Sequence, residues 1–288
     1  MTDRLRRALP VATVLLALAA AWYPAAMWLN HAGAADLADD GAGAREIWLS
    51  TLWLDRPVLP APHQVAGEIM DGLFRHPVTS PRSLVFHAAI TAEAALCGFG
   101  IAVALGTALA IGIVHARTLD RSLMPWVVAS QTVPVLAIAP MVVVVLGNIG
   151  LTGLLPKALI AGWLSFFPIT MAMVTGLRAP DPMQRDLMRT YAASGAQVFT
   201  RLRWPASMAF LFPALKVASA LALVGAIVAE LPTGAQAGLG ARLLAGSYYG
   251  QTLQIWAALF TAAALALLAA GGIDAARACL ARAWGGRL

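Results

Sequence analysis

Six long apolar stretches constrain the fold of this chain more than any other feature. They lie at about residues 9–29, 84–114, 124–146, 154–177, 212–231 and 253–273. Each is at least as long as the ~20 apolar residues with which an α-helix crosses the hydrocarbon core of a bilayer. Of the 288 residues, 60% are hydrophobic and only 12% are charged. The sequence therefore predicts an all-α polytopic membrane protein with six transmembrane helices.

The first apolar stretch admits two interpretations, a retained span or a signal peptide. Three arginines precede it, and small residues that would suit cleavage follow at 32–35. The apolar run is longer than the roughly 7–15 residues of a signal-peptide core. We therefore expect residues 1–30 to be an N-terminal transmembrane helix whose basic end lies in the cytoplasm.

Residues 31–83 form the one long polar region, with four basic and seven acidic residues. We expect this segment on the periplasmic side. About fifty residues are few for an independent domain, so the pattern leaves open whether the segment folds as a cap. Residues 84–275 then form the main membrane domain, and residues 276–288 form a cytoplasmic tail.

The distribution of basic residues predicts the orientation of the spans. In this topology fourteen of the twenty basic residues fall in cytoplasmic segments and six fall outside. Cytoplasmic loops of membrane proteins carry such an excess of lysine and arginine. The net charge of +6 is therefore explained by topology, without a nucleic-acid partner, and both termini are expected in the cytoplasm.

Small residues recur every four positions in the second apolar stretch, at 94, 98, 102, 106 and 110. A similar stripe occupies 218, 222, 225 and 229 in the fifth stretch. Association of helices in lipid depends on close packing, which small residues permit. Both stripes predict helix contacts, either within the chain or with a second copy of it.

The most patterned cytoplasmic segment is the loop 178–211. Two prolines end the helix before it, and residues 183–194 are expected to form a short helix. Gly195 stands where the C-terminus of such a helix favours a left-handed residue. A second short helix over 196–203 is expected to stop at Pro205. Two short helices at the membrane face suit a contact with another protein.

Several polar residues fall inside the apolar stretches, and five of them are candidates for a transport path. A carboxylate in lipid costs at least ~2.5–3.5 kcal/mol on insertion scales, so both acids among them should face the bundle interior or its outer mouth. Two interpretations stay open for these residues. They line a transport path, or they are structural groups. In the second case residues 130–132 form a kink before Pro134, the first acid has a buried structural partner, and the second acid reaches the membrane interface. The five are Glu93, Ser130, Gln131, Thr132 and Glu230.

No constellation of residues indicates an enzyme. The two lysines, Lys157 and Lys216, do not belong to a glycine-rich phosphate loop. The five histidines share no metal-ligand spacing, and no catalytic set converges. The sequence therefore predicts a transport protein with no catalytic, cofactor-binding or metal-binding residues.

Motifs along residues 57–275 resemble those of the inner-membrane permeases of binding-protein-dependent ATP-binding-cassette (ABC) importers, in the branch that handles nitrate, sulfonates and taurine. The resemblance implies the type I ABC importer permease fold. Two of the motifs, at 91–93 and 130–134, look closer to relatives that handle pyrimidine-like thiamine precursors or riboflavin. The motifs are Leu59-Pro60-Ala61-Pro62, Thr91-Ala92-Glu93, Ser130-Gln131-Thr132-Val133-Pro134, Phe167-Pro168-Ile169, Gly195-Ala196, Trp204-Pro205-Ala206, Ala229-Glu230 and Gly238-Leu239-Gly240.

The resemblance also implies that the loop 178–211 docks into a partner ATPase. The family's hallmark there is Glu-Ala-Ala-x-x-x-Gly, followed later by Leu-Pro. Gly195 matches the glycine and Pro205 the proline, and their spacing is shorter than is usual in the family. Either Arg189-Thr190-Tyr191 or Tyr191-Ala192-Ala193 takes the place of Glu-Ala-Ala. The implied coupling residues are Arg189, Tyr191, Ala192, Ala193, Gly195, Ala196 and Pro205.

The implied partners are a cytoplasmic ABC ATPase, a periplasmic solute-binding protein and a second permease copy, most simply an identical one, in the lipid of a bacterial inner membrane. The solute would resemble nitrate, a sulfonate or taurine, or else a pyrimidine or vitamin precursor. The alternative function is a self-sufficient secondary transporter. Such a protein is expected to show internal repeats, and the sequence contains no convincing inverted repeat.

Overall fold

The computed structural model describes residues 2–38, 43–231 and 237–283. These residues form helices joined by turns, with no β-strand among them. Five helices are long and apolar enough to cross a membrane, and a bent pair supplies up to one more span. The prediction of an all-α polytopic membrane protein is therefore confirmed. The five long helices are α1 (Thr2–Asp36), α4 (Leu84–His115), α7 (Leu154–Arg178), α10 (Trp204–Glu230) and α12 (Thr252–Ala283).

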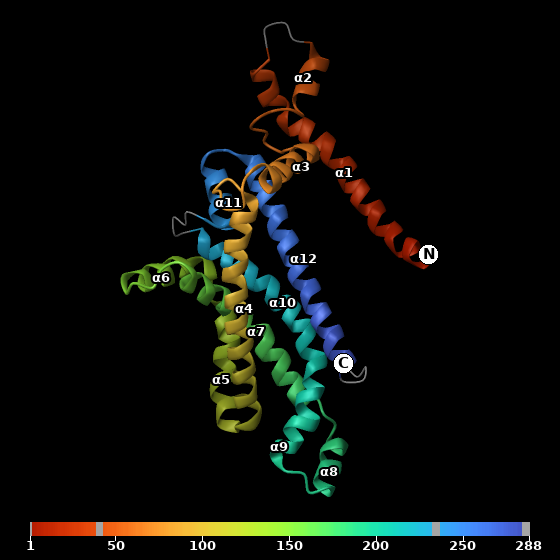
Figure 1. The fold of residues 1–288 in the computed structure, drawn as a ribbon, viewed down its shortest axis with the longest axis vertical. Helices are drawn as coiled ribbons and strands as arrows, with labels where there is room; N and C mark the ends of the chain where they lie inside the picture. The colour runs from red at the N-terminus through yellow and green to blue at the C-terminus, as the bar shows by residue number, and fades with distance from the viewer. Residues whose placement is uncertain (1, 39–42, 232–236, 284–288) are drawn as a thin grey trace. The chain divides into compact units, whose positions relative to one another are not determined.

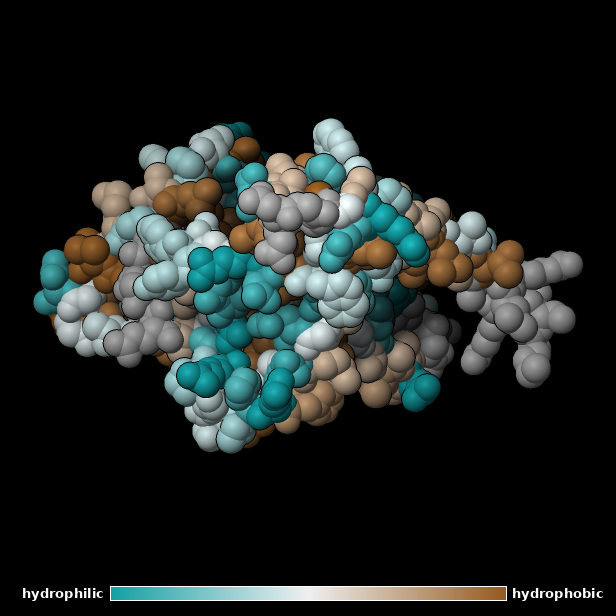
Figure 2. Space-filling view, turned by 90° about the horizontal axis from the view of Figure 1, so that it is seen from above, coloured by the Kyte–Doolittle hydropathy of each residue, from teal (hydrophilic) through white to brown (hydrophobic). Residues whose placement is uncertain are grey.

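The chain divides into two compact units. Unit 1 comprises Met1–His87 and Arg242–Thr261, and unit 2 comprises Ala88–Ala241 and Ala262–Leu288. Helices α4, α11 (Leu239–Tyr248) and α12 run from one unit into the other. The face drawn in Figure 2 carries both hydrophilic and hydrophobic residues.

In unit 1 the polar segment after α1 folds back onto that helix. It contains α2 (Ala44–Ser50) and α3 (Pro62–Met70). The side-chain amide of buried Asn30 donates hydrogen bonds to the carbonyls of Thr51 at 3.3 Å and Leu59 at 2.8 Å, and its Oδ1 accepts one from the Leu59 N–H at 3.1 Å. These bonds pair backbone groups in an irregular stretch that has no ladder of its own. The described part of the polar segment is therefore a cap folded on α1.

In unit 2 the small-residue stripes pack within the chain. A Cβ atom added at Gly106 of α4 would lie 3.0 Å from the Phe166 carbonyl oxygen of α7. One added at Gly225 of α10 would lie 2.6 Å from the Cα atom of Ala161 of α7. Both glycines therefore allow a close approach to α7 that a larger residue would prevent. The stripe on α10 is used against α7.

The third apolar stretch is not one straight span. Helix α5 (Arg117–Ala129) leads into a 3₁₀ turn at Ser130–Thr132, and α6 (Val135–Asn148) then leaves at an angle of 101°. Val133 is extended, with φ −78° and ψ 121°, because a following proline disfavours the helical region. Pro134 then precedes the first residue of α6. In Figure 1, α6 runs across the direction of α5.

Candidate functional site

The first candidate site is the short helix α8 (Pro182–Thr190) together with the turn that follows it. Asp181 caps its start, since Oδ1 accepts a hydrogen bond from the Met183 N–H at 2.8 Å. The Gln184 side chain accepts one from the Asp181 N–H at 3.2 Å. Each contact pairs a backbone N–H that a helix start leaves free. The helix is thus fixed locally, with proline at its first position.

Ala192, not Gly195, is the left-handed residue at the end of α8. Its φ is 50°, and its N–H donates to the Arg189 carbonyl at 2.8 Å. The Ala193 N–H donates to the Met188 carbonyl at 3.0 Å. This pair of bonds is the Schellman motif, in which the left-handed position usually belongs to glycine. The prediction that Gly195 ends this helix is wrong.

Gly195 instead begins the next helix, α9 (Gly195–Val198). Ser194 caps it, because Ser194 Oγ accepts from the Gln197 N–H at 3.3 Å and Gln197 Oε1 accepts from the Ser194 N–H at 2.8 Å. Ser-x-x-Gln is a capping-box sequence, which is the signal that would have identified this start.

The second short helix does not stop at Pro205 either. A π turn, Phe199–Arg203, joins α9 to α10, so the chain is helical from Gly195 to Glu230. Pro205 follows this π turn, in which the Trp204 N–H donates to the Phe199 carbonyl, and such an irregular turn accommodates a residue without an N–H in a continuous helix. The prediction of a break at this proline is therefore wrong.

Helix α8 exposes large apolar side chains on one side. Met183 is 82% exposed, Leu187 56% and Tyr191 77%. Residues spaced by four lie on one face of a helix, and Tyr191 is the cap residue directly after α8, so these three form a stripe, here called the α8 face. Beside it, Arg189 pairs with Asp186 at 3.0 Å, with both side chains largely exposed. In Figure 1, α8 and α9 lie beyond the ends of α7 and α10.

The residues predicted for a transport path lie on separate elements. Ser130 is buried and its hydroxyl donates to the Val127 carbonyl at 2.7 Å. Gln131 and Thr132 are exposed in the turn between α5 and α6, and Glu93 is exposed on α4. Glu230, at the end of α10, is fully buried rather than at an interface.

Glu230 is the centre of the second candidate site. Thr91 Oγ1 of α4 lies 3.1 and 3.0 Å from its two carboxylate oxygens. Lys157 Nζ of α7 lies 3.4 Å from Oε1, and the Gly240 N–H donates to Oε2 at 2.8 Å. The Leu239 N–H donates to Thr91 Oγ1 at 2.8 Å. We call Glu230, Lys157, Thr91 and the backbone of residues 237–240 the Glu230 cluster.

Two members of this cluster were missed from the sequence. Thr91 was placed only within the motif Thr91-Ala92-Glu93, and Lys157 was named only as a lysine outside any phosphate loop. The available signal was charge, since Lys157 is one of two lysines in the sequence and lies at the same predicted membrane side as Glu230. A buried carboxylate requires a partner of opposite charge or several hydrogen-bond donors.

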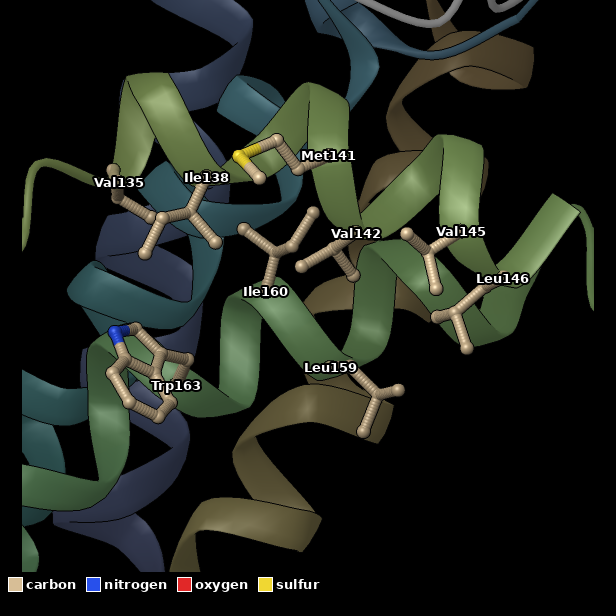
Figure 3. Close-up of a pocket in the computed structure, with 9 residues that line it drawn as sticks. All are labelled: Val135, Ile138, Met141, Val142, Val145, Leu146, Leu159, Ile160 and Trp163. Atoms are coloured by element: carbon tan, nitrogen blue, oxygen red, sulfur yellow. The ribbon is translucent and has the colours of Figure 1, made fainter.

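A groove of about 580 Å³ lies between α6 and α7 in unit 2, as Figure 3 shows. Apart from the indole of Trp163, its lining side chains have no hydrogen-bonding group beyond a methionine sulfur. A polar solute would lose its water there without replacement, so this groove does not suit transport of one. The lining residues are Val135, Ile138, Met141, Val142, Val145, Leu146, Leu159, Ile160 and Trp163.

Comparison with known proteins assigns the chain to a protein family. A family described as "Binding-protein-dependent transport system inner membrane component" matches residues 100–283, which include α8 and Glu230. The chain belongs to this family. It is thus an inner-membrane permease of a binding-protein-dependent ABC importer, as its motifs had suggested.

Several relatives of this permease are named for the solutes that they transport. The riboflavin transport system permease protein RibX of Chloroflexus aurantiacus is 33% identical, over 73% of this chain and 74% of its own. The formylaminopyrimidine transport permease protein ThiX of Halalkalibacterium halodurans is 32% identical, over 67% and 74%. The putative aliphatic sulfonates transport permease protein SsuC of Bacillus subtilis is 25% identical, over 60% and 61%.

Proposed function

We propose that two copies of this permease enclose the path of a small solute, which a periplasmic binding protein delivers and a separate ATPase drives. The α8 face carries the proposal. An apolar stripe on a helix that projects from the bundle suits a protein partner, since soluble surfaces rarely expose such residues together. Tyr191 belongs to the α8 face. Of the other implied coupling residues, Pro205 lies in α10, and the rest lie at the end of α8, in the turn or at the start of α9.

The proposal of a second copy rests on Glu93. This carboxylate is exposed on α4, where contact with lipid would cost at least ~2.5–3.5 kcal/mol. A water-filled path between two copies removes that cost. Leu96 and Cys97, three and four residues further along the same helix, are also exposed, so this side of α4 has room for a partner. Ser130, Gln131 and Thr132 supply further polar groups at the bend between α5 and α6.

The solute we propose is an uncharged or cationic nitrogen heterocycle of the pyrimidine or flavin type. The relatives named for riboflavin and formylaminopyrimidine are 33% and 32% identical, against 25% for the relative named for aliphatic sulfonates. A carboxylate on the path also repels an anion and favours hydrogen-bond donors or positive charge. A nitrate-, sulfonate- or taurine-like solute is the runner-up.

Docking of the ATPase is tested by Leu187→Asp, which places a charge in the α8 face. We expect attachment of the ATPase during co-purification to fall at least ~10-fold, as for a central interface residue. Leu37→Asp is the matched control, because Leu37 is 77% exposed and lies after α1 on the expected periplasmic side. Full ATPase attachment in the Leu187→Asp permease would contradict docking at this face.

The solute is tested in vesicles that contain the permease, the ATPase and the binding protein. Riboflavin, formylaminopyrimidine and an aliphatic sulfonate serve as probes. We expect ATP-dependent uptake of one of the heterocycles and little uptake of the sulfonate. Preferred uptake of the sulfonate would favour the runner-up. Accumulation driven by an ion gradient without the ATPase would instead favour a secondary transporter.

A further inference from the structure

We propose that the Glu230 cluster is a lock that fastens residues 237–240 to the ends of three spans, and that Glu230 is a positioning residue for transport. The lock joins α4 through Thr91, α7 through Lys157 and α10 through Glu230 itself. If these helices tilt at their opposite ends, the cluster moves residues 237–240, here called the turn, together with them as one rigid body. The role of Glu230 in transport rests on the proposed function. The lock itself is inferred only from the distances and burial within the cluster.

The first step is that both oxygens of the Glu230 carboxylate already have hydrogen-bond or ion-pair partners within the protein. Oε1 faces Thr91 Oγ1 at 3.1 Å and Lys157 Nζ at 3.4 Å, and Oε2 faces Thr91 Oγ1 at 3.0 Å and the Gly240 N–H at 2.8 Å. The Glu230 side chain is 0% exposed and that of Lys157 only 13%. A solute passing through the permease therefore has no access to Glu230. Its contacts favour a positioning role over direct binding.

The second step is that the turn is shaped to fit this carboxylate. A Cβ atom at Gly238 would overlap the Glu230 carboxyl group, and one at Gly240 would lie 2.8 Å from Glu230 Cβ. Gly238 also has φ +125°, a conformation that other residues rarely adopt. The Leu239 and Gly240 N–H groups are free donors at the start of α11, and the cluster accepts both. The two glycines thus let the backbone reach Thr91 and Glu230.

The third step is that the lock depends on its two charges together. Lys157 Nζ also donates to the Ala237 carbonyl at 3.3 Å, so the ammonium joins the turn directly as well as through Glu230. Removal of one member of a buried ion pair leaves the other charge uncompensated, which is far more disruptive than removal of both. The single variants Lys157→Met and Glu230→Gln should therefore open the turn more than the double variant does.

The test measures opening at Leu239, whose side chain is fully buried. Leu239→Cys is introduced in a background that lacks Cys97 and Cys279, both of which are exposed. A maleimide then reacts with the purified permease in detergent, so the result does not depend on membrane orientation or on the ATPase. We expect labelling at least ~10-fold faster with Lys157→Met or Glu230→Gln, and slower labelling in the double variant than in either single one.

Lys216→Met is the matched control. It makes the same substitution on α10 and removes an ion pair, because Lys216 Nζ lies 2.5 Å from Asp274 Oδ1. The side chains of Lys216 and Asp274 are 37% and 55% exposed, so this ion pair contributes little and labelling at position 239 should stay unchanged. Thr91→Val serves if the charge variants fail to assemble, since it keeps the shape of the side chain and should still speed labelling. Labelling equal to the control in these variants would overturn the lock.

The role in transport has a separate readout. In vesicles with the ATPase and the binding protein, lock variants should hydrolyse ATP with less dependence on the binding protein, because the turn no longer follows the spans. A purely structural role would lower the amount of assembled permease and leave that dependence intact in the remainder. Faster labelling with normal dependence would retain the lock and overturn the positioning role. Loss of all ATPase attachment in the parent protein would count against the proposed function instead.

Discussion

The Glu230 cluster and the turn after α8 are both held by a few hydrogen bonds, but the cluster is buried whereas the turn lies beside an exposed apolar surface. In the cluster, the charged and polar groups of three helices satisfy one another and are buried. In the turn, backbone bonds fix the end of α8 while Met183, Leu187 and Tyr191 remain exposed. A region that satisfies itself holds a structure together, whereas a rigid region with an unpaired apolar face is prepared for a partner.

The comparison is tested most strongly by Gly238→Ala, for which we expect the largest effect. The new methyl group would overlap the Glu230 carboxyl at a φ of +125°, so we expect a loss of about 3 kcal/mol in stability. Thermal unfolding of the permease in detergent measures it. Gly250→Ala is the control, because Gly250 also has positive φ but no atom lies within 4 Å of the added Cβ. Equal losses in the two variants would mean that strain alone, and not the carboxylate, decides the outcome.

The next largest effect is expected at Ala192, the left-handed residue of the exposed turn. Ala192→Val should destabilise the turn by about 1–2 kcal/mol, because a β-branched residue fits a φ of 50° poorly. Ala192→Gly should act in the opposite direction by up to about 1 kcal/mol. Since the turn lies outside the bundle, ATPase attachment should follow these changes while thermal unfolding hardly moves. A large drop in unfolding temperature with Ala192→Val would contradict the independence of the two regions.

The long helices were predictable because twenty or more apolar residues in sequence have few alternatives in a membrane. Helices α4 and α7 begin and end within about two residues of their expected limits. A kink before Pro134 was one interpretation of the sequence, but its angle of 101° was not predicted. A proline indicates a possible break, but the direction of the next helix depends on the helices against which it packs.

For the two candidate sites, too, local pattern predicted one part and tertiary packing decided the rest. The loop 178–211 was identified from its composition and its two short helices, yet the left-handed position was given to Gly195 because glycine adopts it most readily. The energy difference between alanine and glycine there is only about 1 kcal/mol, which the two bonds to Arg189 and Met188 are able to offset. The pairing of Glu230 with Lys157 joins residues 73 positions apart. Pairing at that separation follows from tertiary packing, which local pattern does not report.

The smallest effect is expected for Gly195→Val, and it separates the observed turn from the predicted one. Had Gly195 been the left-handed residue, valine would cost about 1–2 kcal/mol there. Gly195 is instead the first residue of α9, exposed, with no atom within 4 Å of an added Cβ. We therefore expect a change within about 0.5 kcal/mol, as for exposed positions away from special features. ATPase co-purification, with Ala192→Val beside it, provides the measurement. If Gly195→Val weakened attachment as much as Ala192→Val does, the start of α9 would belong to the docking surface together with the α8 face.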